Sequence, residues 1–296
     1  MHVVVAGSTG LLGTRLTDEL RRRGHAVTRL VREQAHGSDE SRWDPHAGQI
    51  DDQVVEAADV VVNCAGSRLF GIPQTRTWQR NMLESRVNTT RVLAEAIART
   101  ERLPALLACN GSSYYGDHGA EPVTEESASL GDDFMTKVTR AWQAAADPAV
   151  AAGARVCILR NAPVMTRGGD TLGILEPLFK LGLGARLGDG RQYFPAVSIR
   201  DWLGAVAMLV EHPTASGPFN VCSPVTPTNA EFTKAFARTV HRPAFVFVPR
   251  WVLRVGAGPA APELLRSLNL RPAALETLGF EFEDRDIEAI LATALA

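Results

Sequence analysis

The sequence predicts a doubly wound α/β fold, built on a parallel sheet, with a smaller and mostly helical C-terminal lobe. A short β-branched run at the N-terminus is followed by a glycine-rich turn and an amphipathic helix. This alternation of apolar strand and helix continues to about residue 222, and the remainder of the chain is mostly helical. Such alternation is typical of parallel α/β folds. With 296 residues, 45% of them hydrophobic, the chain can bury a core of that size.

The opening stretch predicts a nucleotide-binding turn. The run 3–6 is a strand covered on both faces, and the leucines from Leu11 onward recur at helical spacing up to an arginine-rich end before Gly24. Between strand and helix, Gly7 permits a tight turn, Gly10 lets a pyrophosphate approach the helix N-terminus, and Gly13 lets helix and strand pack closely. A glycine pattern of this kind is equally compatible with a purely structural turn.

The next strand, 26–31, favours a nucleotide with an extra phosphate. It ends at Arg32, where an NAD-binding protein usually carries an acidic residue for the ribose hydroxyls. A guanidinium there suits a 2′-phosphate, which predicts NADP(H). The alternative is an arginine simply exposed to solvent at a strand end.

A later strand and helix extend the predicted crevice. Residues 58–62 lead into Asn-Cys-Ala-Gly at 63–66, and small residues at the carboxyl end of a strand leave room for adenosine. On the following helix, Asn81 and Ser85 share a face with Arg86 beside them. Arg86 could contact the cofactor or be a surface salt-bridge partner, which contributes little stability.

In this order, the motifs resemble those of the extended short-chain dehydrogenase/reductase superfamily, with its Rossmann-like nucleotide half. Those motifs include "NCAG", "SRVNTT", "YYGD", "LRNAPVM", "LGDGRQ", "SIRDW", "GPFNVCSP" and the closing "LRPAALETLGFEF". The set is similar over essentially the whole chain to the atypical branch of epimerase-family, cell-division-inhibitor-like proteins. That branch ends in a C-terminal domain of unknown function.

The resemblance implies NADP(H) as cofactor and assigns positions to it. The phosphate loop, the 2′-phosphate end, the adenosine contact and the helix that flanks the cofactor would be formed by Gly7, Ser8, Thr9, Gly10, Leu11, Leu12, Val31, Arg32, Cys64, Ala65, Asn81 and Arg86. From their places after predicted strands, we also expect Gly66 in the adenosine crevice and Asn161 and Pro163 close to the nicotinamide end.

The catalytic pair usual in the superfamily, a tyrosine and a lysine four residues later, is absent. None of the three tyrosines has a lysine at that offset. The corresponding helix, within 132–146, places Met135 and Thr139 at the two positions, and Lys137 lies on a different side of the helix. This departure makes redox chemistry the open question.

The candidate catalytic residues therefore follow the strand near 106–109. Ser112 or Ser113 could donate a hydrogen bond to a substrate carbonyl, with Ser112 preferred, and Tyr114 or Tyr115 could act as the acid. Each also has a structural reading, because serine favours turns at strand ends and tyrosine often lines or packs a pocket.

The second half of the chain offers fewer signals. Asp201 is a candidate helix cap, and arginines such as Arg266 are scattered and expected at the surface. We expect residues 1–165 to form the NADP-binding domain, to which 196–222 return, and 166–296 to form the substrate lobe, including a family-specific domain at 247–296.

Composition limits the partners and the location. The net charge of -2 gives no reason to expect nucleic acid or an anionic membrane, and no apolar run is long enough to span a bilayer. The four cysteines are widely spaced and read as reduced core thiols, the histidines show no metal-ligand spacing, and no signal peptide precedes the first strand. We expect a cytoplasmic protein without metal, with a small-molecule substrate and, as one option, a homodimeric assembly.

Two functions stay open from the sequence. The first is an NADP(H)-dependent oxidoreductase or epimerase-like enzyme that acts on a small carbonyl or hydroxyl compound. The alternative is a protein that binds NADPH without redox turnover, as a sensor or interaction partner, or one that performs non-redox chemistry on the same fold.

Overall fold

The computed structural model describes residues 1–67, 75–256 and 261–296. The chain forms two compact units: Met1–Asn110, Arg140–Leu159 and Val206–Pro218 make up the first, and Gly111–Thr139, Arg160–Ala205 and Phe219–Ala296 the second. The chain passes into the second unit after Asn110, Leu159 and Pro218. The first two positions lie at the carboxyl ends of strands 105–111 and 156–161, the ends where parallel α/β sheets present their functional loops.

Within the described residues, seven strands form one sheet in the order β11-β7-β5-β4-β1-β2-β3. The registers from β3 across to β5 are parallel, and β1 in the middle aligns Val3 with Val27 on one side and with Val60 on the other. This is the doubly wound order predicted from the sequence. The strands are β1 (His2–Ala6), β2 (Ala26–Val31), β3 (Glu40–Arg42), β4 (Val60–Asn63), β5 (Ala105–Gly111), β7 (Val156–Asn161) and β11 (Gly217–Val221).

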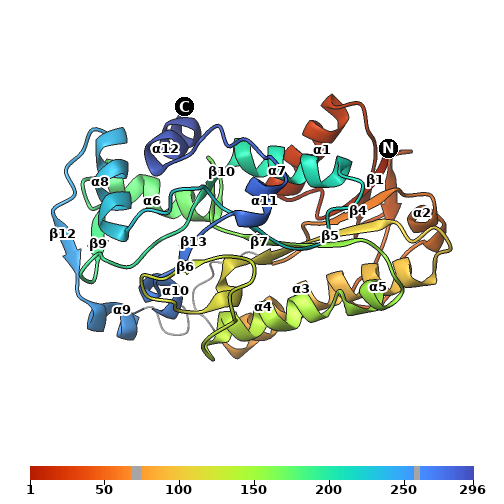
Figure 1. The fold of residues 1–296 in the computed structure, drawn as a ribbon, viewed down its shortest axis with the longest axis horizontal. Helices are drawn as coiled ribbons and strands as arrows, with labels where there is room; N and C mark the ends of the chain where they lie inside the picture. The colour runs from red at the N-terminus through yellow and green to blue at the C-terminus, as the bar shows by residue number, and fades with distance from the viewer. Residues whose placement is uncertain (68–74, 257–260) are drawn as a thin grey trace. The chain divides into compact units, whose positions relative to one another are not determined.

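Helices cover both faces of this sheet (Figure 1). Leu93, Ala96 and Ile97 of α3 share one core with Val4 and Val61 of the strands, as the helical spacing predicts. On the other side, α1 packs against β1 and β2. The helices are α1 (Leu11–Arg22), α2 (Asp52–Glu56), α3 (Arg76–Arg99), α4 (Phe134–Ala144), α5 (Asp147–Ala151) and α7 (Ile199–Glu211).

The second unit consists of helices and short strand pairs. One apolar cluster of this unit joins α6, α8 and α12, where the Phe179 and Phe236 rings stack with centroids 4.2 Å apart. The strands pair as β8 (Val164–Met165) with β10 (Val197–Ser198), β9 (Ala185–Leu187) with β12 (Val246–Val248), and β6 (Pro122–Val123) with β13 (Asn269–Leu270). The remaining elements are η1 (Ser112–Tyr115), α6 (Asp170–Lys180), α8 (Asn229–Thr239), α9 (Arg250–Gly256), α10 (Ala261–Leu265), α11 (Ala273–Thr277) and α12 (Ile287–Leu295).

The role expected for Asp201 is wrong. Asp201 lies inside the first turn of α7, and its own backbone N–H donates to Ser198 Oγ, which acts as the cap. The Asp201 carboxylate instead accepts from the backbone N–H groups of Glu283 and Asp284, each at 2.9 Å. It therefore anchors the segment that leads into α12.

Candidate functional site

In the first unit, the glycine-rich turn has the predicted geometry. Gly7 adopts a φ of +79°, and a Cβ there would lie 2.6 Å from Ala65 N, so only glycine fits against the end of β4. A Cβ on Gly13 would lie 2.1 Å from Gly7 O, which shows how closely α1 approaches the turn. At Gly10 the only neighbour within reach of a Cβ, among the described residues, is Gly7 O at 3.3 Å.

The N-terminus of α1 has the properties of an anion site. The residue that precedes the helix, Gly10, provides no side-chain cap, and no acidic residue lies in the first turn. Ser8 Oγ is buried and has no hydrogen-bond partner among the described residues. A buried hydroxyl without a partner beside uncapped helix amides fits a ligand with phosphate oxygens.

The ends of β2 and β4 carry further candidate residues. Val31 is buried at the end of β2, whereas Arg32 is exposed and forms no ion pair within residues 1–67, 75–256 and 261–296. The Cys64 and Cys109 sulfurs lie 3.7 Å apart, and the hydrogen bond between them together with burial raises the pKa of Cys64 well above its ordinary value. All four cysteines are free thiols.

Arg86 is not a surface residue. It is 8% exposed, its guanidinium donates to Ser67 O at 3.0 Å and to Met82 O at 3.2 Å, and it lies over the Trp142 ring. A Cβ added to Gly66 would lie 3.6 Å from Arg86 Cγ, so the loop after β4 packs directly on this side chain. Arg86 thus fixes that loop, whereas Asn81 on the same helix is exposed. Direct contact of either residue with a cofactor stays a prediction.

One buried hydrogen-bond network in the first unit was not predicted from the sequence. Asn63 is fully buried; its Oδ1 accepts from Ala65 N and its Nδ2 donates to Thr90 Oγ1 at 2.9 Å. Thr90 also accepts from Trp142 Nε1 at 2.8 Å. These bonds hold the turn at 64–66 in place. Asn63 and Thr90 both lie inside motifs that carried the family resemblance, which was the available signal.

In the second unit, the candidate catalytic serines and tyrosines make up η1 (Ser112–Tyr115), directly after β5. Ser112 is 8% exposed. Tyr115 is fully buried, donates to Asn220 Oδ1 at 2.7 Å and accepts from Arg160 at 2.7 Å. Burial raises the pKa of Tyr115 to about 12, although the nearby Arg160 charge acts in the opposite direction. Tyr114 is only partly buried, and the Arg160 guanidinium lies 3.7 Å from its ring centre.

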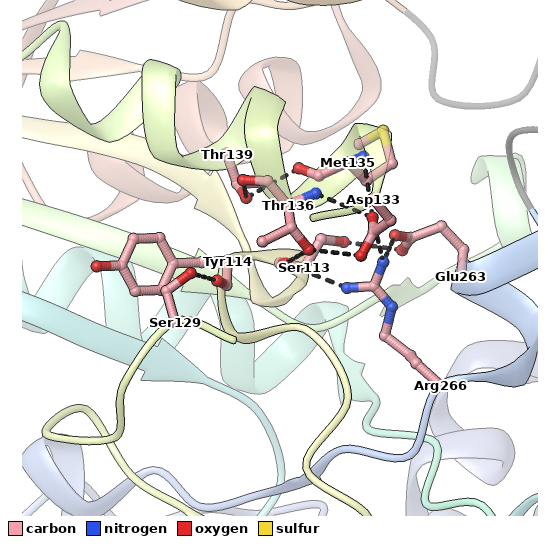
Figure 2. Close-up of polar contacts among 9 residues, drawn as sticks. All are labelled: Ser113, Tyr114, Ser129, Asp133, Met135, Thr136, Thr139, Glu263 and Arg266. Atoms are coloured by element: carbon pink, nitrogen blue, oxygen red, sulfur yellow. Dashed lines mark hydrogen bonds and ion pairs between the residues drawn. The ribbon is translucent and has the colours of Figure 1, made fainter. Parts of the chain in front are cut away.

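The helix expected to carry the dyad is α4, and the polar side chains at and near the two dyad positions bond to other groups of the protein. Thr139 is buried, and its hydroxyl donates to the backbone oxygens of Met135 and Thr136 (Figure 2). Lys137 points elsewhere, as predicted: it is largely exposed and pairs with Asp132 at 3.4 Å.

The two residues expected at the nicotinamide end are bonded within the second unit. Asn161 Oδ1 accepts a hydrogen bond from Trp202 Nε1, and Pro163 O accepts one from Val197 N.

Arg266 is buried, so its expected place at the surface is wrong. Its guanidinium donates to Asp133 at 3.1 Å, to Ser113 O at 3.1 Å and to Glu263 (Figure 2). Ser113 Oγ donates to Glu263 at 2.8 Å, and Thr136 Oγ1 donates to Asp133 at 2.7 Å and contacts Ser113 O. We refer to these five residues, Ser113, Asp133, Thr136, Glu263 and Arg266, as the Arg266 cluster.

The reason for this error is that two carboxylates offset the cost of burying the arginine. The sequence held two local signals for them: Glu263 and Arg266 are three residues apart on a helical stretch, and Asp133 precedes α4 as a cap for Thr136 N. Neither signal indicates that the two segments meet.

Two absences concern the described residues only. No group of three or more histidine, cysteine, aspartate or glutamate side chains there is arranged to hold a metal ion. None of the helices in that part of the chain is long and apolar enough to cross a membrane.

Comparison with known proteins decides the family. Residues 3–222 match the model of the NAD dependent epimerase/dehydratase family. The chain belongs to this family. Residues 248–294 match a second model, described as Domain of unknown function (DUF1731), so the C-terminal domain expected from the resemblance is present.

Similar proteins extend over the full chain. Epimerase family protein MT2273 of Mycobacterium tuberculosis is 36% identical over 293 residues, covering 99% of this chain and 97% of its own. The crystal structure of human epimerase family protein SDR39U1 (isoform2) with NADPH has a TM-score of 0.87 at 30% identity and covers 99% of both chains. The nucleoside-diphosphate sugar epimerase from Corynebacterium glutamicum has a TM-score of 0.82 at 33% identity, covering 100% of this chain and 58% of that one.

Proposed function

We propose that the protein binds NADP(H) and is an oxidoreductase or epimerase-like enzyme that acts on a small carbonyl or hydroxyl compound. The observation that carries the proposal is the turn at residues 7–13, where a buried serine hydroxyl lacks a partner among the described residues beside the uncapped N-terminus of α1. The NADPH in the structure of the human relative supports the choice of cofactor. When bound, NADP(H) would supply or accept a hydride.

Each part of the first unit has a distinct task in this proposal. The amides at the start of α1 and Ser8 Oγ would hold the pyrophosphate. Arg32, exposed and without an ion-pair partner in the described part of the chain, would bind the 2′-phosphate. Cys64 and Ala65, fixed by Asn63 and by the contact with Gly7, would form the wall beside adenosine.

On η1, the two tyrosines are not equivalent as acids. Tyr115 keeps its proton at neutral pH and uses its hydroxyl to bind Arg160 and Asn220, so we assign it a structural role. Ser112 stays the candidate for polarising a substrate carbonyl, and Tyr114 stays the candidate for proton transfer. The positions of the usual dyad, Met135 and Thr139, have no group that can do this work.

That last observation favours a second candidate function. A protein with the same NADP(H) site, but with methionine and a backbone-bonded threonine in place of the dyad, could bind the cofactor without redox turnover. Such a protein would act as a sensor or interaction partner. The cytoplasmic location and the homodimer stay predictions under either function.

Two measurements test the proposal and separate the candidates. Titration calorimetry should detect binding of NADPH, and loss of nicotinamide absorbance with a panel of small aldehydes and ketones should reveal turnover. Binding with turnover supports the enzyme, and binding without turnover across the panel supports the redox-silent protein. If neither NADPH nor NADP⁺ binds, both candidates fail.

A further inference from the structure

A groove in the second unit lies beside one face of α8. Residues Ala230, Thr233 and Ala237 recur along that face at helical spacing, and His241 and Ala244 continue the wall beyond the end of the helix. The groove has a volume of about 740 Å³, within the range typical of small-molecule sites. Its floor therefore consists largely of small side chains that leave space above them.

The described residues that line the groove give it a positive charge. It is lined by Arg186 of β9, by Lys234 and Arg238 of α8, and by His241 and Arg242 just after α8, and none of the lining residues is acidic. Arg238 pairs with Glu288 at 2.5 Å. The other two arginines and the lysine form no ion pair with a described residue. Positive charge is thus concentrated here although the net charge of the chain is -2.

These cations are not needed to cap α8. The backbone N–H groups of His241 and Arg242 already bond Arg238 O and Ala237 O, each at 3.0 Å, and that of Val240 bonds Phe236 O. The carbonyls of Phe236, Ala237 and Arg238, near the end of the helix, are therefore satisfied by the chain itself. The arginine and lysine side chains keep most of their hydrogen-bond donors for another partner.

Two of the arginines are held in place by contacts that leave their charge uncompensated. Gly190 makes room for Arg186, because a Cβ there would lie 2.6 Å from Arg186 Cδ, and the Phe247 ring lies 5.5 Å from the Arg186 guanidinium. Arg242 donates from Nε to Lys180 O at 3.1 Å. Both contacts are to neutral groups, so the positive potential of the groove persists.

We propose that this groove is a binding site for a small phosphorylated anion, distinct from the turn at residues 7–13. Guanidinium groups pair with phosphate oxygens through parallel hydrogen bonds, and several cations around one cleft favour a multiply charged anion over a monovalent one. Three of the four arginine and lysine residues that line the groove, Lys234, Arg238 and Arg242, lie between 222 and 248, outside the segments matched by the two family models. The proposal is independent of the proposed function.

Calorimetry with inorganic pyrophosphate tests the site. The full chain is first saturated with NADPH, so that the turn at residues 7–13 cannot be the site that pyrophosphate occupies. We expect wild type to bind pyrophosphate, and Lys234→Glu to weaken binding by about tenfold or more, because one charged contact becomes repulsive. Arg285→Glu, the same charge reversal at an exposed arginine outside the groove, should leave the affinity unchanged.

Three results would overturn the proposal. They are the absence of pyrophosphate binding by wild type, equal affinity in wild type and Lys234→Glu, and an equal loss in Arg285→Glu. Lys234→Gln serves as a second variant, and because Lys234 is exposed, both substitutions should leave the melting temperature unchanged. Sedimentation with phosphatidylserine vesicles separates the sources of phosphate: binding to vesicles without binding to pyrophosphate would replace the small-molecule site with a membrane surface.

If NADPH itself fails to bind, the pyrophosphate titration is run on the protein alone, and the same two variants decide the outcome. Loss of NADPH binding therefore contradicts the proposed function, whereas loss of pyrophosphate binding contradicts the site in the groove.

Discussion

Neighbouring tyrosines on η1 differ in what surrounds their hydroxyl groups. Tyr115 is fully buried with two hydrogen-bond partners, Asn220 and Arg160, whereas Tyr114 is partly buried and presents its ring to Arg160. A buried hydroxyl with satisfied partners contributes to stability, and its removal leaves those partners unsatisfied. The two residues should therefore respond differently to loss of the hydroxyl.

We predict that Tyr115→Phe lowers the free energy of unfolding by about 1–3 kcal/mol. Tyr114→Phe, the matched control on the same turn, should change it by less than about 0.5 kcal/mol. Urea denaturation followed by circular dichroism measures both. Equal stability of the two variants would show that the Tyr115 network contributes nothing.

The raised pKa of Tyr115 also predicts a pH dependence. Burial raises this pKa from 10.0 to about 12, so the folded protein holds the phenol proton more tightly than the unfolded chain does. The resulting stability is fully present below about pH 10 and is lost as the pH rises through about 12. Wild type should therefore lose stability more steeply than Tyr115→Phe above about pH 10 in the same denaturation assay.

Arg32 tests the choice between the two nicotinamide cofactors. If its guanidinium binds the 2′-phosphate, Arg32→Glu should weaken NADPH binding by about 10–100-fold and improve the relative affinity for NADH. Arg91→Glu, an exposed arginine on α3, is the control with the same charge change. Fluorescence titration with both cofactors provides the affinities, and an unchanged preference would remove Arg32 from the site.

At the level of elements, two helical glycines should behave in opposite ways. A Cβ on Gly13 of α1 would lie 2.1 Å from Gly7 O, whereas a Cβ on Gly173 of α6 would meet no described atom within 4 Å. Gly13→Ala should lower stability by about 3 kcal/mol or more because backbone must move. Gly173→Ala should raise it by about 0.5–1 kcal/mol through helix propensity. Thermal unfolding of the two variants checks the contrast.

Elements with strong local patterns were predictable from the sequence. Six strands of the sheet, α1, α3 and the apolar face of α3 follow from β-branched runs, leucine spacing and glycine punctuation, and the close packing at Gly7 and Gly13 follows from the turn itself. The strand β3 (Glu40–Arg42) was not predicted, because its three polar residues carry no such pattern. The same reasoning identified the missing dyad, because an offset of four on a helix is a local property.

Contacts between distant segments were not predictable. Arg266 and Asp201 were expected to be a surface residue and a helix cap, and each instead holds backbone or carboxylates from a segment far away in the sequence. No periodicity indicates such partners, because the distance between them is set by how the second unit packs. The cationic groove was missed because Arg186 meets Lys234, Arg238 and Arg242 only in the fold.

At the scale of the whole molecule, the Arg266 cluster joins the region of unknown function to the turn after β5. Arg266 and Glu263 lie within the C-terminal match at residues 248–294, and they bond Ser113 and Asp133, which are more than a hundred residues earlier. The C-terminal domain therefore takes part in shaping η1 and the start of α4. Removal or misfolding of this domain should therefore disturb the positions of the candidate catalytic residues on η1, because these contacts would be lost.

Arg266→Met tests this connection. The arginine side chain is 8% exposed, and replacing it leaves the Asp133 and Glu263 carboxylates close together without a cation, which should cost about 3 kcal/mol of unfolding free energy. Arg285→Met, at an exposed arginine, should cost less than about 0.5 kcal/mol. Guanidinium denaturation at neutral pH measures both variants.

The pH dependence of the stability difference between wild type and Arg266→Met identifies the cause of that difference. Burial tends to raise the pKa of Asp133, but the Arg266 charge and the Thr136 hydrogen bonds outweigh it, so the pKa lies below its ordinary value. In wild type, the stability from this carboxylate is present above about pH 4 and is lost as the pH falls through the lowered pKa. In Arg266→Met the unpaired carboxylates instead gain from protonation, so the gap between the two proteins should narrow as the pH falls toward about 4. A gap that stays constant with pH would mean that Arg266 stabilises the fold through packing of its aliphatic stem and not through its charge.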